Sequence, residues 1–247
     1  MEQALLDNTD LPLVLLGGTL CNARLWQPAL ARLNVAATVC VTLAGAGSAQ
    51  QASQRLLNVL PPRFLLAGFS LGAIVALQMA ADAPGRIGGL ALLSANPLVD
   101  PPENAAPRRE AVRTAQAQGI TDWLMSTLWP RYVAPERLDD RALQAVICRM
   151  AQECGITTFA EHTEIAIHRQ DNRAALAALA CPIAILNGAQ DVICTPHHHH
   201  LLAASAGNAA WHTVEASGHF IPLEAPDDVA PPLRQWITEC IQCAKTD

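Results

Sequence analysis

The chain has 247 residues, of which 51% are hydrophobic, so it can bury one large core. Its formal net charge is −6 at pH 7. Proteins that bind nucleic acids or anionic membrane surfaces need an excess of basic residues, so the charge argues against both functions. Residues 1–10 are acidic and predict no secretory signal, and the apolar run at 11–16 is too short to cross a membrane. We therefore expect a cytoplasmic protein whose eight cysteines are reduced thiols.

Apolar runs and helical stretches alternate along most of the chain. Strands are predicted, in chain order, at residues 12–16, 38–43, 64–67, 89–93, 182–186 and 210–214. These runs are nearly continuous in apolar residues, which is typical of parallel strands that helices cover on both faces. Helices are predicted at residues 26–33, 49–60, 71–81, 196–206 and 226–243. The alternation predicts an α/β fold with a mostly parallel, twisted sheet flanked by helices.

The alternation breaks in the middle of the chain, where the sequence predicts helices without strands. These helices are predicted at residues 108–118, 120–128, 136–154 and 157–168. We interpret residues 96–175 as a helical cap inserted into a core domain formed by residues 1–95 and 176–247. The cap holds Trp123, Trp129, Tyr132 and Phe159, which either form its own small core or line a pocket.

The sequence Gly68-Phe69-Ser70-Leu71-Gly72 joins a predicted strand to a predicted helix. In this setting a G-x-S-x-G sequence forms a sharp turn whose serine hydroxyl projects above the C-terminal edge of the sheet. Ser70 is therefore the predicted nucleophile.

A serine hydroxyl is a weak nucleophile at neutral pH and needs an adjacent base. His219 follows the last predicted strand and is the predicted base, whereas His162 and His168 belong to the cap and His212 lies within a strand. Asp191 follows the preceding strand and is predicted to orient the imidazole of His219.

The order serine, aspartate, histidine resembles the α/β-hydrolase superfamily. Four local sequences carry the resemblance: Leu15-Leu16-Gly17-Gly18-Thr19-Leu20, the turn at Ser70, Asn187-Gly188-Ala189-Gln190-Asp191, and Ser217-Gly218-His219-Phe220. The chain is most similar to small capped carboxylesterases, C–C hydrolases and pimeloyl-ester carboxylesterases.

This resemblance implies an oxyanion hole formed by the backbone N–H groups of Thr19 and Leu71. Relatives usually carry His-Gly before the first donor, whereas this chain has Gly17 and Gly18 there. The missing imidazole removes hydrogen bonds that brace this loop in relatives.

Several aromatic residues close to these motifs or in the cap are candidates for a substrate pocket. They are Trp26, Phe69, Trp123, Trp129, Tyr132 and Phe220. We expect no metal and no cofactor, since Cys240 and Cys243 lack a second ligand pair and the histidines at 197–200 are interpreted as a solvated first turn of a helix.

The predicted function is that of a serine hydrolase, which cleaves a carboxylic ester or a related acyl substrate through an acyl-enzyme. The alternatives within the same fold are a small-ligand-binding signalling protein, a C–C hydrolase, a lyase or a cofactor-free peroxidase. The expected partner is a small acyl molecule, with no nucleic acid and no membrane, and the expected state is a monomer or homodimer.

Overall fold

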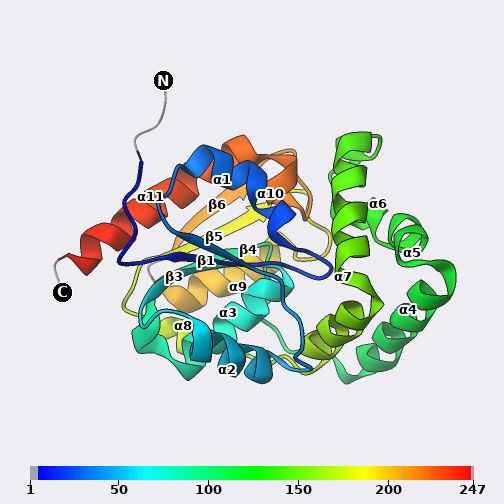
Figure 1. Ribbon diagram of the computed structural model, residues 1–247, viewed down its shortest axis with the longest axis horizontal. Coiled ribbons are helices and arrows are strands. Elements are labelled where there is room, and N and C mark those ends of the chain that lie inside the picture. The colour runs from blue at the N-terminus through cyan, green and yellow to red at the C-terminus, as the bar shows by residue number, and fades with distance from the viewer. Residues whose placement is uncertain (1–4, 208, 246–247) are drawn as a thin grey trace.

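The computed structural model describes residues 5–207 and 209–245, so residues 1–4, 208, 246 and 247 of the predicted core domain lie outside it. Its centre is a six-stranded sheet in the order β2-β1-β3-β4-β5-β6 (Figure 1). The strands are β1 (Leu13–Leu16), β2 (Thr38–Val41), β3 (Phe64–Phe69), β4 (Ile87–Leu93), β5 (Ile183–Gly188) and β6 (Ala210–Val214). Every neighbouring pair of these strands is parallel, which confirms the predicted fold class.

Burial follows the position of each strand in the sheet. The four inner strands, β1, β3, β4 and β5, are buried at every residue. The edge strands β2 and β6 are largely exposed or half-buried. Continuous apolar sequence therefore predicts the inner strands well, because both of their faces are covered by helices.

Helices cover both faces of the sheet (Figure 1). One face carries α1 (Gln27–Leu33) and α11 (Pro226–Ala244), and the other carries α2 (Ala49–Val59), α3 (Leu71–Asp82), α8 (Arg173–Ala177) and α9 (Pro196–Ala206). The contact between α11 and β4 is close at Gly89, where an added Cβ would lie 2.2 Å from Sγ of Cys240. A short helix, α10 (Ile221–Glu224), precedes α11. Four 3₁₀ turns complete the helical elements of the described chain: Ala23–Leu25, Pro84–Arg86, Pro102–Asn104 and Pro135–Arg137.

The segment between β4 and β5 forms helices only, within the part of the chain described. It contains α4 (Ala105–Gln118), α5 (Ile120–Thr127), α6 (Trp129–Tyr132) and α7 (Arg141–Ile167) ahead of α8. These four helices lie together at one end of the sheet (Figure 1). None of the helices in the described ranges is long and apolar enough to cross a lipid bilayer.

Helix α7 differs from the sequence prediction, which placed two helices at 136–154 and 157–168. The helix begins later, after Asp140, whose carboxylate accepts a hydrogen bond from the N–H of Leu143 and caps the first turn. The predicted gap is a single residue, Gly155, with φ 74° and ψ 176°. Because glycine tolerates this backbone conformation, the chain bends there and the helix resumes directly.

Candidate active site

Ser70 lies in a strained turn between β3 and α3, with φ 53° and ψ −112°. The two flanking glycines have no room for a side chain. A Cβ on Gly68 would lie 2.5 Å from the carbonyl oxygen of Gly72, and a Cβ on Gly72 would lie 2.4 Å from that of Leu16. The glycines thus let β3, α3 and β1 approach one another so closely that the turn at Ser70 is forced outward.

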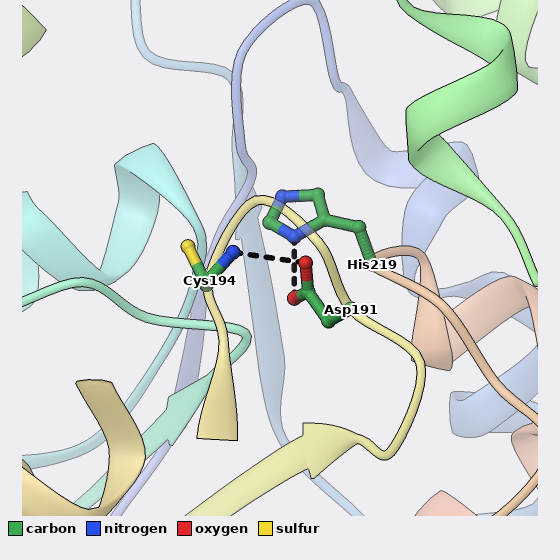
Figure 2. Close-up of side chains that lie close together, drawn as sticks. All are labelled: Asp191, Cys194 and His219. Atoms are coloured by element: carbon green, nitrogen blue, oxygen red, sulfur yellow. Dashed lines mark hydrogen bonds and ion pairs between the residues drawn. The ribbon is translucent and has the colours of Figure 1, made fainter. Parts of the chain in front are cut away.

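The structure brings Ser70, His219 and Asp191 into one hydrogen-bonded line. Nε2 of His219 lies 2.9 Å from Oγ of Ser70, and Nδ1 of His219 lies 2.8 Å from Oδ2 of Asp191. Figure 2 shows the imidazole facing the carboxylate of Asp191. The three residues follow β3, β5 and β6, whose carboxyl ends meet at the same edge of the sheet.

Asp191 is buried and is held in place by backbone groups. Its Oδ1 accepts hydrogen bonds from the N–H groups of Ile193 at 2.8 Å and Cys194 at 2.9 Å. Burial alone would raise the pKa of Asp191, but the charge of His219 and these hydrogen bonds outweigh it, so the pKa is lowered. An ionised Asp191 accepts a hydrogen bond from the Nδ1–H of His219, which leaves the Nε2 lone pair facing the hydroxyl of Ser70.

The loop that carries His219 is fixed to the segment after α6. The N–H of His219 donates to the carbonyl oxygen of Tyr132 at 2.9 Å. One carboxylate oxygen of Glu224 accepts hydrogen bonds from both Gly218 N–H at 3.0 Å and Ala134 N–H at 2.8 Å. Sequence reasoning interpreted Glu224 as a structural polar position without chemistry and did not identify its partners, which are backbone groups. The signal available was an acidic residue shortly after the Ser-Gly-His-Phe sequence.

The two predicted oxyanion donors lie on the same cavity as Ser70. Thr19 follows β1, and Leu71 is the first residue of α3, where backbone N–H groups have no partner within the helix. The loop after β1 crosses the serine turn closely: a Cβ on Gly18 would lie 2.8 Å from the ring of Phe69 and 3.2 Å from Cβ of Ser70. This geometry places the candidate donors beside the nucleophile, and their function remains a prediction.

A cavity of about 570 Å³ opens onto Ser70 and His219. Its aromatic wall consists of Phe69, Trp123, Tyr132, Phe159 and Phe220. The cavity is therefore bounded by the edge of the sheet on one side and by helices of the 96–175 segment on the other. Four of the six predicted pocket residues line it, together with Phe159, one of the cap aromatics that the sequence left open between a pocket and a core position.

Two of the predicted pocket residues lie elsewhere. Trp26 is 1% exposed, directly precedes α1 and belongs to the buried core, and it is absent from the cavity wall. Trp129 is also absent from the wall, and its indole N–H donates to the carbonyl oxygen of Leu138 at 3.1 Å. The sequence places Trp26 near a motif and Trp129 in the predicted cap, but it does not show which way their rings point.

Among the described residues, Asp191, Cys194 and His219 form a group whose potential ligand atoms lie within 4.8 Å of one another. Their functional groups are engaged in other ways. The carboxylate binds the imidazole and the backbone N–H of Cys194 (Figure 2), and burial raises the pKa of the Cys194 thiol well above its usual range. A neutral buried thiol is a weak metal ligand, so the arrangement fits proton transfer better than metal binding.

One histidine of the 197–200 run departs from the predicted solvated turn. His199 is fully buried; its Nδ1 donates to the carbonyl oxygen of Thr195 at 3.0 Å and its Nε2 accepts from the N–H of Ala95 at 2.9 Å. Burial lowers its pKa to about 4, so the ring is neutral at pH 7. The ring thus ties the loop after β4 to the start of α9, a contact that local sequence does not reveal.

A parallel sheet with helices on both faces and a strained serine turn at its carboxyl edge defines the α/β-hydrolase fold. A model of the alpha/beta hydrolase family matches residues 13–231 of the chain, so the chain belongs to this family.

Two curated relatives are similar over most of the chain. The pimeloyl-[acyl-carrier protein] methyl ester esterase of Aromatoleum aromaticum is 29% identical over 72% of this chain and 75% of that protein. The biotin biosynthesis bifunctional protein BioHC of Cellvibrio japonicus is 29% identical over 81% of this chain. The match spans only 44% of the length of that bifunctional protein.

Solved structures share the fold at lower identity. A thermophilic esterase from Thermogutta terrifontis has a TM-score of 0.83 at 22% identity, with 93% of this chain and 90% of that chain covered. The enol-lactonase from Burkholderia xenovorans LB400 has a TM-score of 0.80 at 21% identity, with 93% and 92% covered. At this identity the likeness shows the fold and leaves the substrate open.

Proposed function

We propose that this protein is a hydrolase that cleaves carboxylic esters through an acyl-enzyme on Ser70. The observation that carries the proposal is the line of hydrogen bonds from Oγ of Ser70 to His219 at 2.9 Å and on to Asp191 at 2.8 Å. Further support comes from the curated relative named as a methyl ester esterase and from the esterase and lactonase that share the fold.

In the first half of the reaction, Nε2 of His219 takes the proton of Ser70 as Oγ attacks the ester carbonyl carbon. The negative charge that develops on the carbonyl oxygen is stabilised by the N–H groups of Thr19 and Leu71. When the tetrahedral intermediate collapses, His219 returns the proton to the departing alcohol. Asp191 remains ionised throughout and stabilises the imidazolium.

In the second half, His219 takes a proton from water, and the hydroxide attacks the acyl-enzyme carbonyl. The C–O bond to Ser70 then breaks, the proton passes to its Oγ, and the carboxylic acid is released. The helical segment 96–175 acts as a cap that contributes aromatic rings and also Arg108, Arg131 and Arg169 to the cavity wall. The aromatic part of the wall favours small and medium apolar acyl groups. The proposal includes the division of the chain into this cap and a core domain formed by residues 1–95 and 176–247.

The test combines turnover with active-site labelling. The wild-type protein should hydrolyse members of a p-nitrophenyl ester panel and gain the mass of one fluorophosphonate label, while Ser70→Ala should do neither. Ser205→Ala is the matched control, because its hydroxyl only donates to the carbonyl oxygen of Leu201 within α9, and it should behave like the wild type. Labelling that persists in Ser70→Ala would contradict the proposed nucleophile.

A labelled Ser70 without turnover of any ester in the panel would instead favour the alternatives of C–C bond hydrolysis or ligand binding. These use the same serine site with other substrates, so a diketone substrate and a ligand screen would follow. Such a result would overturn ester cleavage while leaving the assignment of the nucleophile in place.

A further inference from the structure

His162 lies on α7 and bridges two loops at the edge of the sheet. Its ring is fully buried; Nδ1 accepts a hydrogen bond from the N–H of Leu20 at 3.1 Å, and Nε2 lies 2.5 Å from the carbonyl oxygen of Leu43. A backbone N–H can only donate and a carbonyl oxygen can only accept. The ring therefore carries its single proton on Nε2, and both of its nitrogen atoms are satisfied.

Leu20 is the residue directly after Thr19, and its backbone is in the left-handed region with φ 57°. A leucine in this region costs about 1–2 kcal/mol, so it persists only where the surroundings hold it. The preceding residues, Gly17 and Gly18, contribute no side chain that could brace the loop. The hydrogen bond to His162 fixes the peptide plane between Thr19 and Leu20. It therefore restrains the backbone of Thr19, whose N–H is the proposed oxyanion donor.

Further contacts join α7 to the same loop and its continuation. On the other side of the bend at Gly155, Sγ of Cys154 lies 3.6 Å from the carbonyl oxygen of Cys21, and Glu153 accepts a hydrogen bond from the side chain of Asn22 at 2.8 Å. The helix thus holds consecutive residues of the loop after β1 from both of its halves.

Helix α7 also binds the loop after β2, which contains Leu43, the second hydrogen-bond partner of His162. The carboxylate of Glu161 accepts a hydrogen bond from the N–H of Gly45 at 2.7 Å. Leu43 and Gly45 are therefore both bound by adjacent residues of α7, so the carbonyl oxygen that orients the imidazole is itself fixed.

We infer that His162 is a positioning residue that holds the oxyanion-hole loop in its working geometry from the helical segment. The inference rests on the proposed function. His162 does not line the cavity and is fully buried, so it acts on the substrate only through Leu20 and Thr19. Burial lowers the pKa of His162 and outweighs the opposing effects of Leu43 and Glu161, which keeps the ring neutral and Nδ1 free to accept.

Three substitutions separate the two hydrogen bonds. In His162→Asn the amide oxygen takes the place of Nδ1 and keeps the acceptor for Leu20. In His162→Gln the amide nitrogen takes the place of Nε2 and keeps the donor for Leu43, while the acceptor for Leu20 is lost. His162→Leu removes both bonds. The control is His168→Asn, at the exposed end of the same helix, whose side chain pairs with Glu164.

Loss of one oxyanion donor lowers the rate about 10²–10³-fold. A mobile loop after β1 would misplace the N–H of Thr19 and should cause a substantial part of that decrease. With p-nitrophenyl butyrate we expect His162→Gln and His162→Leu to lose roughly 10-fold or more in kcat with little change in KM, and His162→Asn to retain most of kcat. A trifluoromethyl ketone, which forms an oxyanion on the serine, should lose affinity in the same order. His168→Asn should match the wild type.

Melting temperatures of all variants show which of them are folded at the assay temperature. Equal kcat in His162→Asn and His162→Gln, or wild-type kcat in a folded His162→Leu, would contradict the positioning role while the proposed function stands. A wild-type protein without turnover that depends on Ser70 would contradict the proposed function and this role together. The Ser70→Ala comparison is made first, so the two failures are distinguishable.

Discussion

At the scale of single residues, the site depends on which nitrogen of His219 carries the proton. Asp191 decides this, because an ionised carboxylate 2.8 Å from Nδ1 can only accept. Two backbone N–H groups, from Ile193 and Cys194, hold that carboxylate in place and help to lower its pKa.

Replacing Asp191 with Asn should therefore reduce kcat far more than stability. The amide can present its NH₂ group to Nδ1 and turn the imidazole to the wrong tautomer, an effect that costs about 10⁴ in kcat in a comparable triad. Steady-state hydrolysis of p-nitrophenyl butyrate measures the loss. Asp139→Asn, at an exposed position, should be neutral, and near-normal turnover in Asp191→Asn would identify a different acidic partner.

Sequence reasoning proposed Ser70, Asp191 and His219 because each follows a strand, and the structure brings the three together because the carboxyl ends of parallel strands meet at one edge of the sheet. It did not find the functions argued for Glu224, His199 and His162. Each of these side chains binds a backbone group of a segment far away in the sequence: the N–H of Ala134, of Ala95 and of Leu20, respectively. Contacts of this kind leave no local pattern, because any residue can supply a backbone N–H.

At the scale of elements, the sequence predicted the positions of the uniformly buried strands well and the ends of the strands less accurately. The inner strands are continuous apolar runs and were placed within about two residues. Strand β2 was predicted to reach residue 43 but ends at Val41. Leu43 remains apolar and buried, yet its carbonyl oxygen binds His162 instead of a neighbouring strand.

The bend in α7 yields a prediction about stability. Gly155 has φ 74° and ψ 176°, a region that is almost restricted to glycine, while a Cβ there would meet nothing within 4 Å. Gly155→Ala should therefore lower the free energy of unfolding by about 1–3 kcal/mol through backbone strain alone. Urea denaturation measures the change.

Gly85→Ala is the matched control, because Gly85 also has open space around its Cα but no positive φ. It should change the free energy of unfolding little. If both variants were equally stable, the bend at Gly155 would carry no strain for alanine and α7 would be straight or differently bent in solution. Because the residues on both sides of the bend hold the loop after β1, Gly155→Ala should also lower kcat.

At the scale of the whole molecule, buried carboxylates connect the segments and make stability depend on pH. Asp100 pairs with Arg108 at 2.7 Å and with Arg169 at 2.9 Å, which ties the loop after β4 to α4 and to the end of α7. Burial would raise the pKa of Asp100, but the two guanidinium groups outweigh it and lower the pKa. The pKa of Asp191 is lowered as well.

The sign of the pH effect follows from these lowered pKa values. A carboxyl whose folded pKa lies below its unfolded value of about 3.9 contributes its full stabilisation above that value and loses it as the pH falls through the folded pKa. The free energy of unfolding should thus fall steeply below about pH 4. Urea titrations between pH 7 and pH 3 measure this decrease. In Asp100→Asn the free energy of unfolding should fall less steeply with decreasing pH. An unchanged pH dependence would show that Asp100 is not the group responsible.

Under the proposed function, the cavity between the sheet edge and the helical segment should determine which acyl chains fit. Each buried methylene contributes about 0.8 kcal/mol, or roughly fourfold in kcat/KM, so activity should rise from acetyl to butyryl or hexanoyl esters and then fall as the space fills. Trp123 lines the cavity and packs on Phe159 with ring centroids 4.9 Å apart, so Trp123→Ala should move the optimum to longer chains.

Trp129 supplies the matched control, because it is as buried as Trp123 but lies outside the cavity wall. Trp129→Ala should lower the melting temperature and leave the order of preference among esters unchanged. The two tryptophans were indistinguishable in the sequence, and only the packing of the helices separates a ring that lines the cavity from one that donates to Leu138. If the profile shifted in Trp129→Ala and not in Trp123→Ala, the helical segment would be arranged differently over the site, and the aromatic wall would not be what selects the acyl chain.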